Sequence, residues 1–143
     1  MLTPEAIASL PIEEYAFPGA LRDALVAAIL AGQKTSTTSL LSDYTSHGEP
    51  LPVVGDRGVV IDSLENPVCV TEVTEVRILP LREVDLPHAI DEGEGFETVS
   101  EWRTAHERFW HSADFRQWTG DPSFSVTDAT DAVLVRFRVT TRL

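Results

Sequence analysis

The segment from Val133 to Thr140 constrains the fold more than any other part of the sequence. Its odd positions hold only valine and phenylalanine, whereas its even positions include two arginines and a threonine. This alternation with a period of two predicts a strand that turns one face toward a core.

Two further strands are predicted upstream. Residues 58–62 and 68–79 are rich in Val, Ile and Thr, and a turn at residues 65–67 separates them. The alternation in the longer run is imperfect, which predicts a bulge or a bend near residues 72–75. We therefore expect a small mixed or antiparallel β-barrel.

Helical patterns lie around these strands, so the expected fold class is α+β. Apolar residues at helical spacing predict a helix over residues 19–31 with Arg22 in solvent, and Gly32 is suited to end it. Asp85 can cap a short helix that ends near Gly93. Residues 111–131 are polar and predict a loop. The length of 143 residues fits one domain.

The first candidate for chemistry is Lys34, which stands three residues before Thr37 inside a run of hydroxyl residues. A lysine can act as a base when it is desolvated or as a fixed positive charge when it is not, and a hydroxyl can act as a nucleophile. The alternative is an ordinary polar segment after a helix. The stretch is not a phosphate-binding loop, because its glycine, lysine and hydroxyl spacing is wrong.

Two later segments carry further candidates. Glu92 and Glu94 lie on a glycine-rich backbone, where the alternative is a solvated acidic turn. A capping box at residues 98–101 opens a helix that places Trp102 and His106 on one apolar stripe. A histidine in such a stripe is more often a hydrogen-bonded core residue than a catalyst.

The formal net charge of −12 argues against non-specific binding to long nucleic acids. A nucleoside or a short single-stranded RNA is the expected partner, and non-specific binding to duplex DNA is not expected. Cys69 is the only cysteine and is expected to be a buried free thiol. Without a signal peptide or an apolar run that could span a membrane, a cytoplasmic protein is expected, with no membrane partner.

Four motifs follow one another over roughly residues 17 to 141: Gly32-x-Lys34-x-x-Thr37, residues 48–56, Ala89-x-x-Glu92-Gly93-Glu94-Gly95 and Trp102-Arg103-x-x-His106-x-x-Phe109. In these motifs and their order the chain resembles the ASCH domain family, in its longer bacterial branch. The resemblance implies a PUA-like barrel flanked by helices. It divides the chain into an N-terminal helical extension, residues 1–16, and an ASCH domain, residues 17–143.

The same resemblance implies an amidohydrolase site in which Lys34, Thr37 and Glu92 are catalytic. Thr37 would attack the amide carbonyl of a 4-acetylcytidine-type substrate, with Lys34 assisting. An acidic neighbour stabilises the charged form of a lysine, so two arrangements stay open: Lys34 is the base if desolvation dominates, and Glu92 is the base if it does not.

Six more residues are expected to contact the substrate: Tyr44, Arg57, Glu94, Trp102, Arg103 and His106. The family also includes RNA-binding modules and ribonucleases, so a single-stranded RNA-binding protein, a ribonuclease and a module without turnover remain alternatives. No cofactor is expected. No metal is expected either, because nothing in the spacing of Asp56, Asp62 and Glu92 demands a divalent cation.

Overall fold

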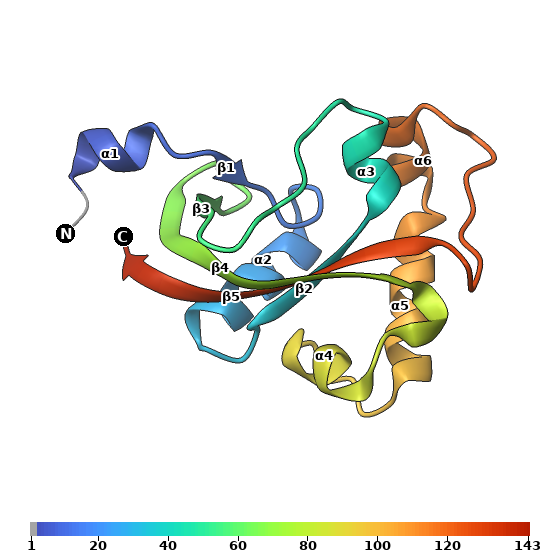
Figure 1. Ribbon diagram of the computed structural model, residues 1–143. Helices are drawn as coiled ribbons and strands as arrows, with labels where there is room; N and C mark the ends of the chain where they lie inside the picture. Colours follow the sequence, from blue (N-terminus) through green and yellow to red (C-terminus); the bar gives the residue numbers. More distant parts are fainter. Residues whose placement is uncertain (1–2) are drawn as a thin grey trace.

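The computed structural model describes residues 3–143, which form one mixed sheet and six α-helices. Figure 1 shows the longest strands crossing the molecule, with helices gathered at one end and the first helix and the C-terminus near the other. The elements in chain order are α1 (Pro4–Ala8), β1 (Ile12–Glu13), α2 (Ala20–Leu30), β2 (Ser36–Leu40), α3 (Leu41–Thr45), β3 (Arg57–Ile61), β4 (Pro67–Pro80), the 3₁₀ turn η1 (Leu81–Glu83), α4 (Leu86–Asp91), α5 (Val99–Trp110), α6 (Ala113–Thr119) and β5 (Asp131–Arg142).

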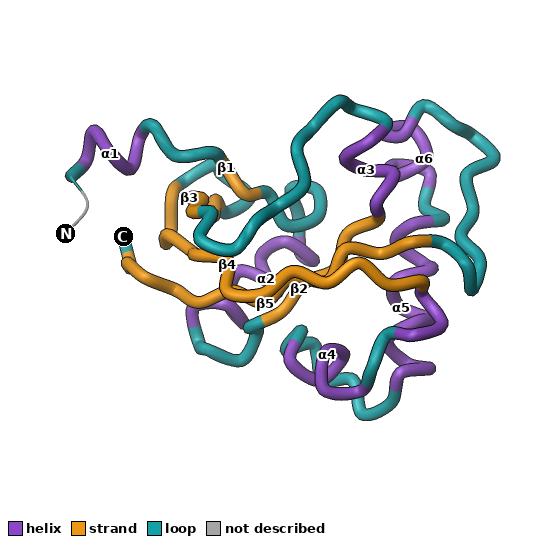
Figure 2. The backbone as a smooth tube through the Cα atoms, viewed as in Figure 1, coloured by secondary structure: helices purple, strands orange, loops and turns teal. Residues whose placement is uncertain are grey.

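The strand order is β1-β3-β4-β5-β2, in which only the β1–β3 pair is parallel. The mixed α+β class is therefore confirmed. Within residues 3–143 no pairing joins β1 to β2, so the sheet curls in a barrel-like way but stays open, and the expected closure does not occur. In this order β2 is an edge strand, and Figure 2 shows it running alongside its partner β5.

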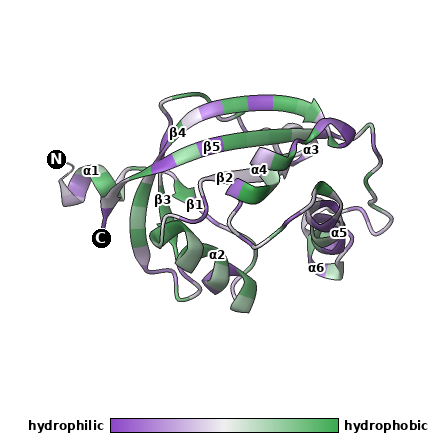
Figure 3. Ribbon diagram, turned by 90° about the horizontal axis from the view of Figure 1, so that it is seen from below, coloured by the Kyte–Doolittle hydropathy of each residue, from purple (hydrophilic) through white to green (hydrophobic). Residues whose placement is uncertain are grey.

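The irregularity predicted in the long strand is present. The register between β4 and β5 shifts between Val73 and Glu75, and a second shift lies between Val70 and Thr71. An extra residue on one strand increases its local twist. These shifts accompany the bend of the sheet around α2. Figure 3 also shows hydrophobic and hydrophilic residues interleaved along β4 and β5.

The sheet has a core on each face. Leu134 and Ala132 of β5 pack with Trp102 and Trp110 of α5 on one face. On the other face, Phe137 packs with residues of α2 and β3, with Tyr15 beside them. Successive residues of a strand point to opposite faces. Even-numbered residues of β5 such as Leu134 therefore face the first core, and odd-numbered ones such as Phe137 face the second. A residue of β2 faces the same core as its partner in β5.

The predicted side-chain caps of α4 and α5 are present, and α1 has one as well. The Thr3 side chain accepts from Ala6 at the start of α1, and Asp85 accepts from His88 at the start of α4. The capping box of Thr98 and Glu101 opens α5 as expected. The predicted loop at residues 111–131 contains the helix α6, which the sequence pattern did not indicate. No helix in residues 3–143 is long and apolar enough to cross a membrane.

Candidate active site

Lys34 is held at a defined point just after α2. Gly32 leaves the helix with a φ of 77°, and the amides of Gln33 and Lys34 both donate to the Ala28 carbonyl at 2.9 and 3.1 Å. The Lys34 side chain is only 2% exposed, and its Nζ donates to the Ser36 carbonyl at 2.8 Å. This residue is the only lysine in the chain.

The exit of α4 packs directly on the Lys34 segment. The Thr35 amide donates to the Asp91 carbonyl at 2.8 Å, and Gly93 follows with a φ of 74°. A Cβ at Gly93 would lie 2.6 Å from the Gln33 carbonyl oxygen. Only glycine allows this approach, which brings Glu92 to Lys34.

Replacing Gly93 with alanine is therefore expected to destabilise the protein by at least about 2 kcal/mol, from the left-handed φ and the backbone clash together. Chemical denaturation of Gly93→Ala measures the loss. Gly95→Ala is the matched control, because Gly95 also has a positive φ of 86° but a Cβ there meets nothing within 4 Å. Equal losses in the two variants would contradict the close packing.

Three hydrogen-bond donors and the Lys34 ammonium surround the buried Glu92 carboxylate, which is 1% exposed. Oε1 lies 3.1 Å from His106 Nε2 and 3.6 Å from Lys34 Nζ. Oε2 accepts from the Thr38 hydroxyl at 2.9 Å and from the Trp102 indole N–H. Both oxygens are therefore occupied by groups from β2, α5 and the loop before β2.

These donors control the ionisation of Glu92. Burial acts to raise its pKa, but His106, Lys34 and the Trp102 hydrogen bond outweigh burial and lower the pKa to about 2. Burial conversely acts to lower the pKa of His106, and the Glu92 charge and hydrogen bond raise it overall. Glu92 is therefore a permanent anion at neutral pH.

A fixed hydrogen-bond chain supports Glu92 from β2 and α4. The Thr38 oxygen lies 2.7 Å from His88 Nε2 while its proton goes to Glu92, so His88 must be protonated on Nε2 and donate to Thr38. Burial lowers the pKa of His88 to about 4, which keeps the ring neutral. Ser36 anchors the same helix by donating to the His88 carbonyl at 2.9 Å.

Thr37 points to the opposite face of β2. It pairs with Val135, whereas Thr38 pairs with Leu134, so Thr37 shares its face with Phe137. Within residues 3–143, no hydrogen bond joins the Thr37 hydroxyl to Lys34 or Glu92. The neighbouring hydroxyl on its face is that of Ser39, which lies 2.7 Å from the Tyr44 hydroxyl. Tyr44 therefore lies on the same side of β2 as Thr37.

Tyr15 completes the surroundings of Lys34, and sequence reasoning missed it. Its ring centroid lies 5.8 Å from Lys34 Nζ. The buried Arg22 positions this ring by donating to the carbonyls of Tyr15 at 3.1 Å and Ala16 at 2.8 Å. Arg22 is 1% exposed, so the expectation that it faces solvent is wrong. Tyr15 belongs to an irregular segment without periodicity, and no sequence signal could have found it.

Comparison with protein families gives a match to the ASCH domain over residues 13–141. The chain belongs to the ASCH family. Comparison with curated protein sequences gave no match.

Solved structures support the ASCH fold, which is PUA-like. An ASCH domain from Lactobacillus crispatus JV V101 superposes with a TM-score of 0.80 at 26% identity, covering 96% of this chain and 84% of that one. A protein of Enterococcus faecalis V583 from family DUF984 superposes with a TM-score of 0.79 at 24% identity, covering 99% of this chain and 79% of that one.

In this ASCH domain, four of the residues predicted for the site gather around Lys34: Glu92, Glu94, Trp102 and His106. Two predicted contacts lie elsewhere. Arg57 of β3 is paired with Glu72 at 3.4 Å. Arg103 turns away from Trp102 and pairs with Glu107 and Asp128, both at 3.1 Å. The structure therefore does not bring either arginine to Glu92.

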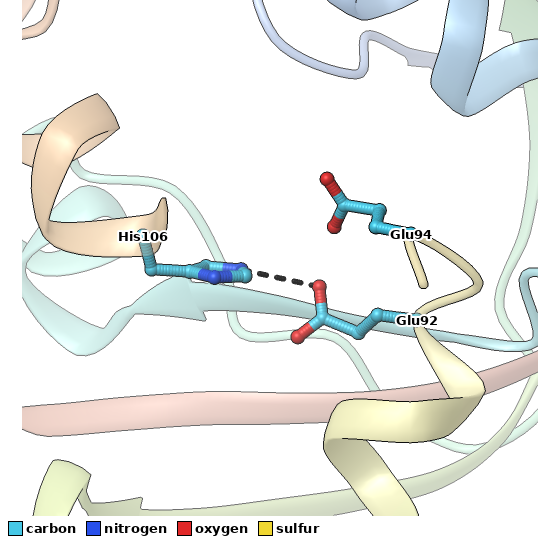
Figure 4. Close-up of side chains that lie close together, drawn as sticks. All are labelled: Glu92, Glu94 and His106. Carbon is cyan, nitrogen blue, oxygen red and sulfur yellow. Dashed lines mark hydrogen bonds and ion pairs between the residues drawn. The ribbon is translucent and has the colours of Figure 1, made fainter. Parts of the chain in front are cut away.

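Glu92, Glu94 and His106 form the one group in residues 3–143 that could hold a metal ion, with ligand atoms within 4.8 Å of one another. Figure 4 shows the two carboxylates and the imidazole converging. The donor set does not suit a divalent cation, because Oε1 of Glu92 already faces both the Lys34 ammonium and His106. Lys34 supplies the positive charge at this point.

Proposed function

We propose that this ASCH domain recognises a modified nucleoside or RNA base and removes an acetyl group from it, as in 4-acetylcytidine. The observation that carries the proposal is the burial of the chain's only lysine against a carboxylate that already accepts three hydrogen bonds. A buried ion pair is a weak source of stability, since apolar residues of similar volume do as well or better. Because burying this pair costs free energy of desolvation, its presence suits a site that must present a charge to a reacting group.

The geometry favours Thr37 over Thr38 as the nucleophile. The Thr38 hydroxyl already accepts a hydrogen bond from His88 and donates one to Glu92. The Thr37 hydroxyl makes no hydrogen bond to either of these residues, and it faces the side of β2 on which Tyr15 lies beside Lys34. A nucleophile needs a free lone pair and a reachable carbonyl, which Thr37 can provide.

The surroundings of Glu92 also favour one of the two arrangements left open by the sequence. A carboxylate that accepts three hydrogen bonds, pairs with an ammonium and has a pKa of about 2 is a poor proton acceptor at neutral pH. Glu92 then orients the Lys34 side chain. In this arrangement Lys34 stabilises the negative charge that develops on the carbonyl oxygen when Thr37 attacks.

The charge distribution favours a nucleoside over a long RNA. Six of the arginines pair with carboxylates, which leaves little free positive charge for a phosphate backbone: Arg22, Arg57, Arg77, Arg103, Arg136 and Arg138. The PUA-like fold is an RNA-binding fold, which keeps a base in single-stranded RNA as the second candidate ligand. A cytoplasmic location belongs to the same proposal, because the buried Cys69 forms no disulfide.

The test compares Thr37→Ala with Thr38→Val on 4-acetylcytidine and on a short single-stranded RNA, with products separated by chromatography. We expect the wild type to release cytidine and Thr37→Ala to release none, while its stability stays near that of the wild type. Thr38→Val leaves the His88 N–H unpaired and removes one of the two hydrogen bonds to Glu92 Oε2, and it is expected to cost about 1–3 kcal/mol of stability.

Each other outcome points to a different function. Cleaved RNA beside intact 4-acetylcytidine would make the protein a ribonuclease. Binding without any product would make it a non-catalytic nucleotide-binding module. Full turnover by Thr37→Ala would exclude Thr37 as the nucleophile.

A further inference from the structure

The buried guanidinium of Arg22 fastens the irregular segment that precedes α2. Its Nε donates to the Tyr15 carbonyl at 3.1 Å, and its Nη2 donates to the Ala16 carbonyl at 2.8 Å. Nη2 also pairs with the Glu14 carboxylate at 3.5 Å, and Nη1 donates to the Asp62 carbonyl just after β3 at 3.4 Å. These contacts, which we call the Arg22 clamp, tie the segment to α2 and to the end of β3.

The segment held by the Arg22 clamp has a strained backbone. Ala16 has a φ of 57°, a left-handed conformation that the Cβ of alanine disfavours. Residues in such conformations persist where the surrounding structure fixes them, and they cluster at functional sites. Burying the charge of Arg22 also costs desolvation that an apolar residue at the same place in α2 would avoid. Two unfavourable features therefore serve to place one short segment.

The side chain placed by this segment is Tyr15. Its ring packs against Phe137 of β5, with centroids 6.2 Å apart and ring planes tilted by 54°. Lys34 Nζ lies 5.8 Å from the Tyr15 centroid, within the range of about 6 Å over which an aromatic face attracts a cation. Within residues 3–143 the Tyr15 hydroxyl makes no hydrogen bond. The ring, and not its polar end, is therefore what the clamp brings to Lys34.

The Lys34 ammonium needs such a contact to stay in one place. It is a point charge on a flexible four-carbon stem. Its one hydrogen bond goes to the Ser36 carbonyl at 2.8 Å, whereas Glu92 Oε1 lies 3.6 Å away, beyond hydrogen-bond distance. An aromatic face attracts a cation without accepting its proton. The Tyr15 ring can therefore restrain the ammonium and leave its charge available to a substrate oxygen.

We propose that Tyr15, held by the Arg22 clamp, is the positioning residue for Lys34. The expected effect on rate rests on the deacetylation proposed above, in which Lys34 stabilises the negative charge that develops on the carbonyl oxygen. A charge already in place for that task needs no reorganisation during the reaction. Tyr15 acts through Lys34 and takes no part in proton transfer.

The first experiment reads the position of Lys34 without turnover. Protein labelled with ¹³C-lysine gives one ε-methylene signal, because Lys34 is the only lysine. The ring current of Tyr15 displaces the proton shift of this methylene from its value in free lysine. We expect Tyr15→Leu to return the signal toward that value. Tyr15→Phe is the matched control, because it keeps the ring and should keep the wild-type shift.

Arg22→Met tests the clamp in the same spectrum. It removes the three hydrogen bonds to backbone carbonyls and adds no second lysine. We expect the lysine signal to move in the same direction as in Tyr15→Leu. A signal that stays at the wild-type shift in Tyr15→Leu would overturn the contact between Tyr15 and Lys34. A signal that moves in Tyr15→Leu but not in folded Arg22→Met would overturn the role of the clamp.

The second experiment measures kcat and KM for 4-acetylcytidine. We expect Tyr15→Leu to lose about 10- to 10²-fold in kcat with KM unchanged, since displacing a catalytic group weakens stabilisation of the transition state. Tyr15→Phe should keep both constants. A raised KM with unchanged kcat in Tyr15→Leu would show that Tyr15 contacts the substrate, and would overturn the positioning role.

A mutant cycle decides whether Tyr15 acts through Lys34. In the Lys34→Met background the group to be positioned is absent, so Tyr15→Leu should cause no further loss of kcat. The same fold-loss in both backgrounds would overturn the proposal. A wild type that releases no cytidine would instead overturn the deacetylase function, and the lysine signal would still decide whether Tyr15 positions Lys34.

Discussion

Glu92→Gln is expected to destabilise the protein by about 3–5 kcal/mol, the cost of removing one partner from a buried ion pair. The amide has nearly the shape of the carboxylate, so the loss is electrostatic and does not come from a cavity. The ammonium of Lys34 would stay buried without a counter-ion, and the amide nitrogen would face a donor from Thr38, Trp102 or His106.

The pH dependence of stability tests the same pair. Because the pKa of Glu92 falls from 4.5 to about 2 on folding, its stabilisation is present above pH 4.5 and is lost as the pH falls toward 2. A shift of this size corresponds to about 3 kcal/mol. Urea denaturation of wild type and Glu92→Gln from pH 7 to pH 2 should show a difference that shrinks in this window. A difference independent of pH would contradict the ionised state of Glu92.

The parts of the fold that depend on local patterns were predictable. The period of two marked β5, and the disturbed alternation marked the bulges of β4. Side-chain caps marked the start of α4 and α5, since a cap is a contact between residues three apart in sequence. In each case the information lies within a few residues.

Features that depend on tertiary contacts were not predictable. Arg22 is buried because it bonds carbonyls of the irregular segment before α2, although its place in the helix suggested solvent. The sheet stays open because β1 has two residues and pairs only with β3. Neither the partner of a buried arginine nor the closure of a sheet is encoded in local periodicity.

The candidate site shows the same division. The Ala-x-x-Glu and Trp-Arg-x-x-His motifs led to Glu92, Trp102 and His106, which meet as expected. His88 and Thr38 were missed, because neither belongs to those motifs and their contact spans fifty residues. The Trp-Arg-x-x-His motif also suggested Arg103, but a helix turns adjacent positions such as 102 and 103 away from each other.

Lys34→Met is expected to reduce deacetylation by at least about 10²–10³-fold, the usual effect of removing one group that stabilises the developing oxyanion. Methionine keeps the length and apolar stem of the side chain, so the packing beside Tyr15 is retained, while the hydrogen bond to the Ser36 carbonyl is lost. Glu92 keeps its three hydrogen bonds, and the stability loss should therefore be smaller than in Glu92→Gln. Turnover of 4-acetylcytidine and urea denaturation measure the two effects.

The double variant Lys34→Met/Glu92→Gln decides whether the two residues act as a pair. Because it removes both charges together, we expect it to be more stable than the sum of the single losses implies, with a coupling within the 0.5–3 kcal/mol seen for contacting residues. Since Lys34 is the only lysine, protein labelled with ¹³C-lysine gives one side-chain resonance that reports its state directly. A lysine resonance unchanged by Glu92→Gln, together with additive losses, would show that the pair is not coupled and would remove the basis for the proposed oxyanion site.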